Sequence, residues 1–125
     1  MNEQSFEDAV SRICEKDGDY DAEAYYFVRE SLDRTVRALG REDAKDRHVT
    51  GQELCEGIRA HALEQFGPLS LLVLSQWGVF ETADFGRIVH ALVNEGVFGK
   101  KPTDSVDDFK DVYSFEEAFE RPYAP

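Results

Sequence analysis

The sequence contains little cysteine, little basic charge and no long hydrophobic run. Its two cysteines, Cys14 and Cys55, form no CxxC pair, and both sit among apolar residues at helical spacing. Isolated cysteines of this kind are typically small buried hydrophobic residues, so we expect neither a zinc site nor a redox motif. The apolar run at residues 69–74 is far shorter than the roughly 20 residues that span a bilayer, so we expect no membrane helix.

The start of the chain, MNEQSFEDAV, lacks the basic and apolar regions of a secretion signal. Together with the isolated cysteines, this predicts a cytoplasmic protein. The 125 residues carry 42% apolar side chains, which is typical of a single globular domain at positions 1–125. We expect a helical core at 1–102, followed by an acidic, aromatic segment at 103–125.

The charge is strongly unbalanced toward acid. Aspartate and glutamate number 26 against 14 lysines and arginines, which gives a net charge of −12. Such a field repels phosphate backbones and anionic lipids, so nucleic acid and membrane surfaces are disfavoured as partners. A basic protein partner, or solubility alone, fits this charge better. No motif for a cofactor is present, and we expect none.

Helix signals dominate the pattern. Asp21 is a good N-cap for a helix that carries a continuous apolar stripe and ends at Gly40. Thr50 and Glu53 form the pattern of a capping box before the next helix. Five main helices are expected, and the fold class is therefore all-α.

The segment at 68–77 has almost no polar face, so we interpret it as the buried central helix. An amphipathic helix is predicted at 83–95. Each of these two helices ends in the same tripeptide, Gly-Val-Phe, beginning at Gly78 and at Gly96. A left-handed glycine followed by an apolar residue is typical of a helix C-terminus.

The two helices resemble a helix-turn-helix, and residues 95–100 could open a β-wing after Gly96. A DNA-reading helix needs exposed basic or amide side chains. The candidates here are Arg87, His90, Asn94, Lys100 and Lys101. Acidic residues at Glu81, Asp84 and Glu95 oppose them. A winged-helix scaffold without nucleic acid is therefore preferred to a DNA-binding one.

Aromatic residues are the main candidates for a partner surface, because they are enriched where interfaces concentrate binding energy. The set is Trp77, Phe80, Phe98, Phe109, Tyr113, Phe115 and Phe119. The alternative is that all of them belong to the core. We expect the aromatic segment at 103–125 to pack back on the domain, in cis or in trans.

Two other features are weaker. The turn at 17–23 has alternating acids like the start of a calcium loop, but its glycine is misplaced and Val28 stands where a bidentate Glu is needed. A solvated turn is preferred. His61 and Glu64 share a helix face at i,i+3, and an enzyme using this pair is a third hypothesis. Whether the chain is an enzyme stays open, with a non-enzymatic role preferred.

Three stretches carry a family resemblance. They cover residues 21–40, 48–100 and 105–119 and contain GQEL…GIR…ALEQFGP, WGV…T.DFG.IV..LV and DF…Y.FEEAF. In this combination the chain resembles the Minf-type family of small bacterial proteins. The resemblance implies a bacterial, cytoplasmic protein and no particular chemistry. Leu and an aromatic residue are more usual in that pattern at Cys55 and His61, which argues against a shared catalytic role for either.

The leading hypothesis is a non-enzymatic interaction or regulatory module that presents an acidic surface to a basic partner or to a second copy of itself. A winged-helix transcriptional regulator is the first alternative, and an enzyme of undefined class is the second.

Overall fold

The fold is built from helices. A computed structural model describes residues 3–41, 48–98 and 106–125, and these ranges contain no strand. The all-α prediction is therefore confirmed for the described chain. Its α-helices are α1 (Glu3–Lys16), α2 (Ala22–Ala38), α3 (Gly51–Phe66), α4 (Ser70–Gln76) and α5 (Thr82–Asn94). Short turns complete it: η1 (Gly67–Leu69), η2 (Val106–Phe109), the π-helical η3 (Glu116–Glu120) and η4 (Arg121–Tyr123).

The predicted caps are present at the starts of α2 and α3. The Asp21 side chain accepts the Glu23 N–H at 2.9 Å. Thr50 and Glu53 form a reciprocal capping box, with both hydrogen bonds at 3.0 Å. The same Glu53 carboxylate receives both guanidinium nitrogens of Arg41, at 2.8 and 3.2 Å. Arg41, three residues beyond the end of α2, is thereby tied to the first turn of α3.

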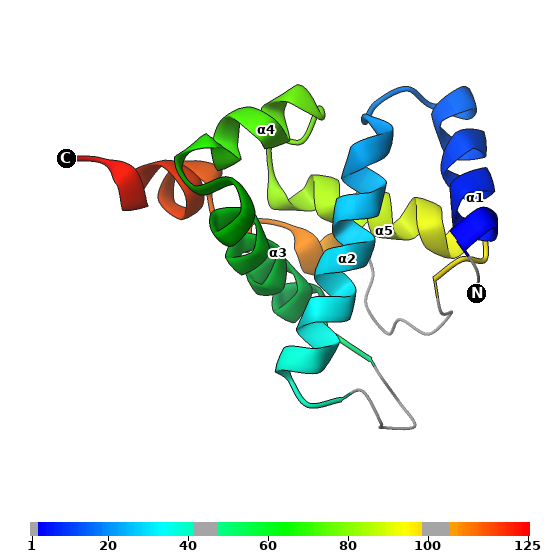
Figure 1. The fold of residues 1–125 in the computed structure, drawn as a ribbon, viewed down its shortest axis with the longest axis horizontal. Helices are drawn as coiled ribbons and strands as arrows, with labels where there is room; N and C mark the ends of the chain where they lie inside the picture. Colours follow the sequence, from blue (N-terminus) through cyan, green and yellow to red (C-terminus); the bar gives the residue numbers. More distant parts are fainter. Residues whose placement is uncertain (1–2, 42–47, 99–105) are drawn as a thin grey trace.

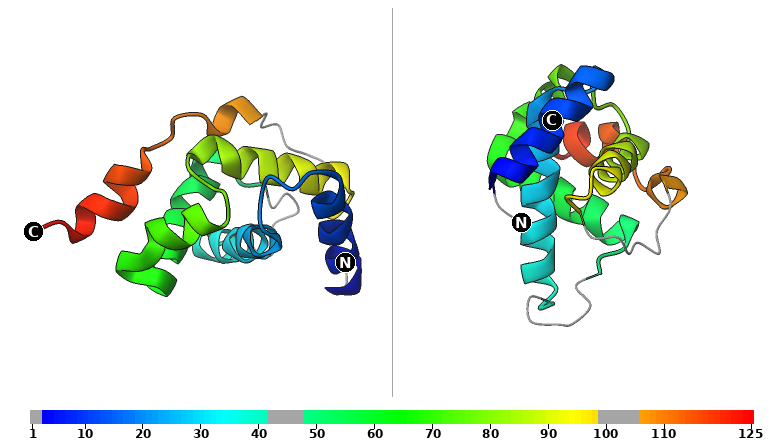
Figure 2. Two further views of the ribbon diagram at one scale, coloured as in Figure 1. Left: turned by 90° about the horizontal axis from the view of Figure 1, so that it is seen from above. Right: turned by 90° about the vertical axis from the view of Figure 1, so that its right-hand side faces the viewer.

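Helices α2 and α3 approach each other closely because Gly57 has no side chain. A Cβ at Gly57 would overlap the Oγ1 atom of Thr35 on α2. Helix α5 crosses α2 at a steep angle, as Figures 1 and 2 show. It contacts α1, α2 and α3. The core lies among these four helices.

The two Gly-Val-Phe helix ends have the predicted geometry. Gly78 and Gly96 take φ values of +85° and +77°. The following Val79 and Val97 donate their N–H groups to the carbonyl five residues earlier, at 2.9 and 3.1 Å. Both valines are buried, which is the hydrophobic contact expected of this ending. The first of these endings turns the chain from α4 toward α5.

The prediction that α4 is a buried central helix is wrong. Leu74 is buried, but Leu69 just before α4 and Leu72 within it are 57% and 54% exposed. The helix lies at the periphery, beside the C-terminal turns (Figure 1). The rings of the C-terminal segment occupy core volume next to α3 and α5, so α4 covers them with one face and leaves its other face in solvent.

The C-terminal segment packs on the helical core. Phe109, Phe115 and Phe119 are all less than 10% exposed and belong to the same hydrophobic cluster as α1, α2 and α5. Gly86 of α5 makes room for this segment, because a Cβ there would lie 2.9 Å from three side-chain carbons of Phe109. Helix α1 and the C-terminal η4 end at opposite ends of the long axis (Figure 1).

Two further expectations concern the β-wing and a membrane-spanning helix. Val97 and Phe98 form no strand, and the remainder of the predicted β-wing, with Lys100 and Lys101, lies outside the described residues. Within the described ranges, no helix combines the length and apolar character needed to cross a bilayer.

Candidate functional site

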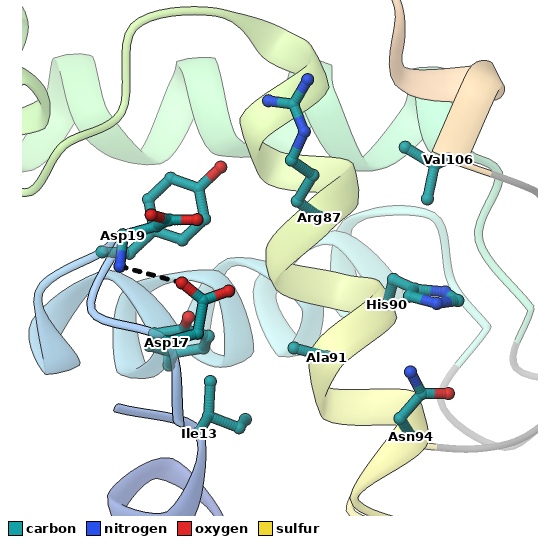
Figure 3. Close-up of a pocket in the computed structure, with 10 residues that line it drawn as sticks. Ile13, Asp17, Asp19, Arg87, His90, Ala91, Asn94 and Val106 are labelled. Carbon is teal, nitrogen blue, oxygen red and sulfur yellow. Dashed lines mark hydrogen bonds between the residues drawn. The ribbon is translucent and has the colours of Figure 1, made fainter. Parts of the chain in front are cut away.

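The polar site with the clearest geometry is a cavity of about 330 Å³ between the α1–α2 loop and α5 (Figure 3). The loop contributes two carboxylates and Tyr20, α2 contributes Tyr25, and α5 contributes the polar side chains of Arg87, His90 and Asn94. The lining residues are Ile13, Asp17, Asp19, Tyr20, Tyr25, Arg87, His90, Ala91, Asn94 and Val106. The cavity joins two features that are separate in the sequence, the acidic turn and the helix face considered for DNA reading.

A buried carboxylate beside this cavity fixes its walls. Asp84 Oδ1 accepts hydrogen bonds from the Tyr20 hydroxyl and from Arg87 Nη1, both at 2.6 Å. Its Oδ2 atom accepts the N–H groups of Phe80 and Glu81, at 2.9 and 3.1 Å. Burial, together with the hydrogen bond to Asp84, raises the pKa of Tyr20. Asp84 therefore caps α5 and also holds one side chain on each wall.

The two walls carry opposite charges that do not pair. Arg87 forms ion pairs with Asp84 and, at 3.9 Å, with Glu81, and among the described residues it pairs with neither Asp17 nor Asp19. The Asp17 Oδ1 atom accepts the Asp19 N–H at 3.3 Å. A separate hydrogen bond between the two carboxyl side chains, followed by the charge of Asp17, raises the pKa of Asp19. The loop wall thus keeps two neighbouring carboxylates, and the α5 wall keeps a half-exposed guanidinium.

The residues proposed for DNA reading are only partly brought together. Arg87, His90 and Asn94 are exposed on α5, while Lys100 and Lys101 lie outside the described residues. Figure 3 shows His90 and Asn94 on the side of α5 away from the two loop carboxylates. Since Arg87 is held by Asp84 and faces further acids, the described part of this surface offers phosphate little net positive charge.

His61 and Glu64, the pair considered for catalysis, are not joined. The His61 side chain is 1% exposed and lies parallel to the Phe27 ring, with 4.2 Å between ring centroids. Glu64 instead forms an ion pair with Arg34. Desolvation, followed by the positive charge of Arg34, lowers the pKa of His61. A buried neutral imidazole without access to substrate is suited to packing rather than to general acid–base chemistry.

The polar contacts of His61 are internal. Its Nδ1 atom lies 2.7 Å from Ser31 Oγ. The Nε2 atom lies 3.0 Å from Glu30 Oε1, but without hydrogen-bond geometry, so it has no hydrogen-bond partner among the described residues. The described chain holds no cluster of three or more His, Cys, Asp or Glu side chains able to bind a metal ion.

Most of the aromatic residues predicted for a partner surface lie inside the molecule. Phe109, Phe115 and Phe119 are core residues, and the half-buried Tyr113 donates its hydroxyl to the Cys55 carbonyl at 2.6 Å. Trp77 and Phe98 are also half-buried, and Trp77 packs on the rings of Phe27 and Phe66. Phe80 alone of the seven is well exposed, at 66%.

Sequence reasoning missed a different apolar surface. Leu69 and Leu72 are three residues apart and therefore share a face. Tyr123, 46% exposed, places its hydroxyl 3.9 Å from the Cβ position of Gly67 at the start of the same turn. We call Leu69, Leu72 and Tyr123 the α4 face. Its leucines were visible in the sequence, but apolarity alone indicated burial.

No protein-family model, curated protein or solved structure matches this chain. The resemblance to the Minf-type family therefore stays a prediction.

Proposed function

We propose that this chain is a non-enzymatic protein-interaction module whose docking surface is the α4 face. The observation that carries the proposal is the exposure of Leu69 and Leu72, at 57% and 54%, in the leucine-rich stretch at 69–74. Two adjacent leucines left in water cost free energy that a partner's apolar residues can recover, at about 25 cal/mol for each Å² buried. The Tyr123 ring enlarges the face beside them.

Charge around the α4 face supports a basic partner. The η3 turn packs against α4 and carries the exposed acids Glu116, Glu117 and Glu120. The nearby Arg121 is 3.8 Å from Glu116 and offsets part of this charge. A partner helix with leucine-like residues on one stripe and lysine or arginine at its borders would complement both the apolar centre and the acidic rim.

Self-association is less favoured than a basic partner. Two copies would each bring a net charge of −12 to the contact. Like charges at an interface oppose association, and the repulsion is strongest at low ionic strength. The test must therefore distinguish a homodimer through the α4 face from a complex with a basic partner.

The DNA-binding alternative has weaker support in the described residues. It needs Arg87 to attract a polyanionic backbone, but Asp84, whose Oδ1 atom is 2.6 Å from Arg87 Nη1, already offsets the charge of this guanidinium. Acidic side chains at Asp19 and Glu81 are close enough to influence this part of the molecule. A winged-helix regulator would have to overcome this field.

The test compares three tagged proteins in affinity capture from lysate of the source cell. These are the wild type, the double variant Leu69→Ser with Leu72→Ser, and the control Leu39→Ser. Leu39 is 41% exposed, but it follows α2 and lies away from the α4 face. We expect a basic partner to be retained by the wild type and the control, lost by the double variant, and released as salt rises.

Two results would overturn the proposal. One is a partner set that the double variant retains unchanged. The other is a set that collapses on nuclease treatment, which would favour the winged-helix regulator. Sedimentation of the purified wild type identifies a homodimer, which would replace the basic partner if it depended on Leu69 and Leu72.

A further inference from the structure

The cavity between the α1–α2 loop and α5 shares no lining residue with the α4 face. Opposite charges face each other across it without contact. Figure 3 shows the carboxylates of Asp17 and Asp19 on the loop side and Arg87 on the α5 side. Among the described residues, no ion pair crosses between them. A gap bounded by both signs of charge is complementary to a molecule that carries both.

The guanidinium is held in place before any ligand arrives. Nη1 of Arg87 donates to Asp84 Oδ1 at 2.6 Å, and that carboxylate is itself fixed by Tyr20 and the first turn of α5. A guanidinium has five N–H donors, so others remain for an anionic group. The side chain is 51% exposed. Because the side chain is already held in place, less of its conformational entropy is lost when a ligand binds.

The loop carboxylates favour an ammonium group. Asp17 and Asp19 are both exposed, and Asp17 raises the pKa of Asp19 by its hydrogen bond and by its negative charge. A cation placed between them would relieve this repulsion. Ile13 and Ala91 give the cavity an apolar part near Asp17 (Figure 3). Its volume of about 330 Å³ suits a small molecule.

We propose that this cavity binds a free α-amino acid with an apolar side chain, its ammonium group at Asp17 and Asp19, its carboxylate at Arg87, and its side chain against Ile13 and Ala91. An α-amino acid carries one charge for each wall. A simple anion would meet two carboxylates, and a simple cation would meet the guanidinium. Neither would satisfy both walls.

The test compares L-leucine with two analogues, each of which lacks one of its two charged groups. L-leucine has both charged groups, 3-methylbutylamine lacks the carboxylate, and 4-methylpentanoate lacks the ammonium. Binding is measured by titration calorimetry, and the site is mapped by amide chemical-shift changes in the full chain. We expect leucine to bind at least about tenfold more tightly than either analogue. The shift changes should centre on the α1–α2 loop and α5.

Variants assign each charge to its wall. With Arg87→Gln, leucine should bind no more tightly than 3-methylbutylamine. With Asp19→Asn, leucine should bind no more tightly than 4-methylpentanoate. Asp17→Asn lies outside the Asp84 network and repeats the second test if a variant at Arg87 lowers stability. The controls Arg121→Gln and Asp33→Asn neutralise exposed charges on η4 and α2, outside the cavity lining. They should bind leucine like the wild type.

Three outcomes would overturn the proposal. The first is the absence of leucine binding at millimolar concentration. The second is equal affinity for leucine and the amine, which would indicate a cation site only. The third is shift changes located away from the cavity. Because capture through the α4 face uses other residues, a failure here leaves the interaction proposal standing, and the reverse also holds.

Discussion

The Ser31 hydroxyl of α2 lies 2.7 Å from Nδ1 of His61 of α3, inside the interface between the two helices. Both side chains are almost fully buried, and the imidazole is stacked on Phe27. Burial in this position makes the charged form of His61 costly, and the nearby Arg34 adds to that cost. The α2–α3 interface therefore depends on a neutral histidine.

Stability should fall when the pH drops through the range in which histidine titrates. The pKa of His61 is lowered in the folded protein from its ordinary value of 6.5, so the unfolded chain binds the proton more readily. The contribution of His61 is complete above about pH 6.5 and is lost below it, until the folded-state pKa is passed. The change in the free energy of unfolding that one histidine causes cannot exceed about 1.4 kcal/mol per pH unit. Urea unfolding at pH 7.5 and pH 5.5 measures it.

The variant His61→Phe isolates this effect. The ring keeps its stacking on Phe27 but loses the contact with Ser31, so we expect it to be about 1–3 kcal/mol less stable at pH 7.5. Its stability should change less than that of the wild type between the two pH values. Parallel pH dependences in the two proteins would show that His61 is not the responsible group.

Replacing Gly86 by alanine should displace the C-terminal segment. The new Cβ would lie 2.9 Å from the Cβ, Cγ and Cδ2 atoms of Phe109, and a Cβ atom cannot move without its backbone. Overpacking of this kind costs about 1–3 kcal/mol, more than the helix propensity gained from alanine. Limited proteolysis within 106–125, together with urea unfolding, measures the effect.

Gly18→Ala is the matched control for Gly86→Ala. Nothing lies within 4 Å of its Cβ position, and the residue is exposed in the α1–α2 loop. We expect a change within about 0.5 kcal/mol and no new cleavage near the C-terminus. Equal behaviour of the two variants would mean that the contact between α5 and Phe109 does not hold the segment.

The two free cysteines should differ in reactivity toward a thiol reagent. Burial raises the pKa of the Cys55 thiol to about 12, and its side chain is 0% exposed. Cys14 is half-buried, and burial also raises its pKa. Since the thiolate is the reactive form and must be reached, Cys14 should react first and Cys55 only on unfolding. Absorbance assays on Cys14→Ser and Cys55→Ser assign the phases, and fast native labelling of Cys14→Ser would contradict the expectation.

Local chemistry made much of the fold predictable. Asp21, the Thr50–Glu53 pair, and the glycines at 78 and 96 each act on neighbouring backbone groups, so the sequence carries their full signal. The position of α4 was not predictable in this way. Whether an apolar helix is buried depends on what else fills the core, and here the rings of Phe115 and Phe119 are part of it.

The cavity was out of reach of sequence reasoning for a similar reason. Asp19 and Arg87 were each noted, one in an acidic turn and one on a candidate recognition helix. They face the same space because long-range contacts hold the loop in place, among them the hydrogen bond from Tyr20 to Asp84, a residue 64 positions away. No local pattern encodes that contact. For the aromatic segment at 103–125, composition predicted that it packs on the domain. It did not predict which of the aromatic rings would be buried there.

The bond between Tyr20 and Asp84 also bears on the order of folding. Asp84 can cap its own helix as soon as α5 forms, because Phe80 and Glu81 are adjacent in the chain. Closing the contact with Tyr20 requires α2, α3 and α4 to be brought into a loop first, and contacts of such long sequence separation are slow to form. We therefore expect the capped start of α5 to form early, and the contact between Tyr20 and Asp84 that joins the α1–α2 loop to it to form late.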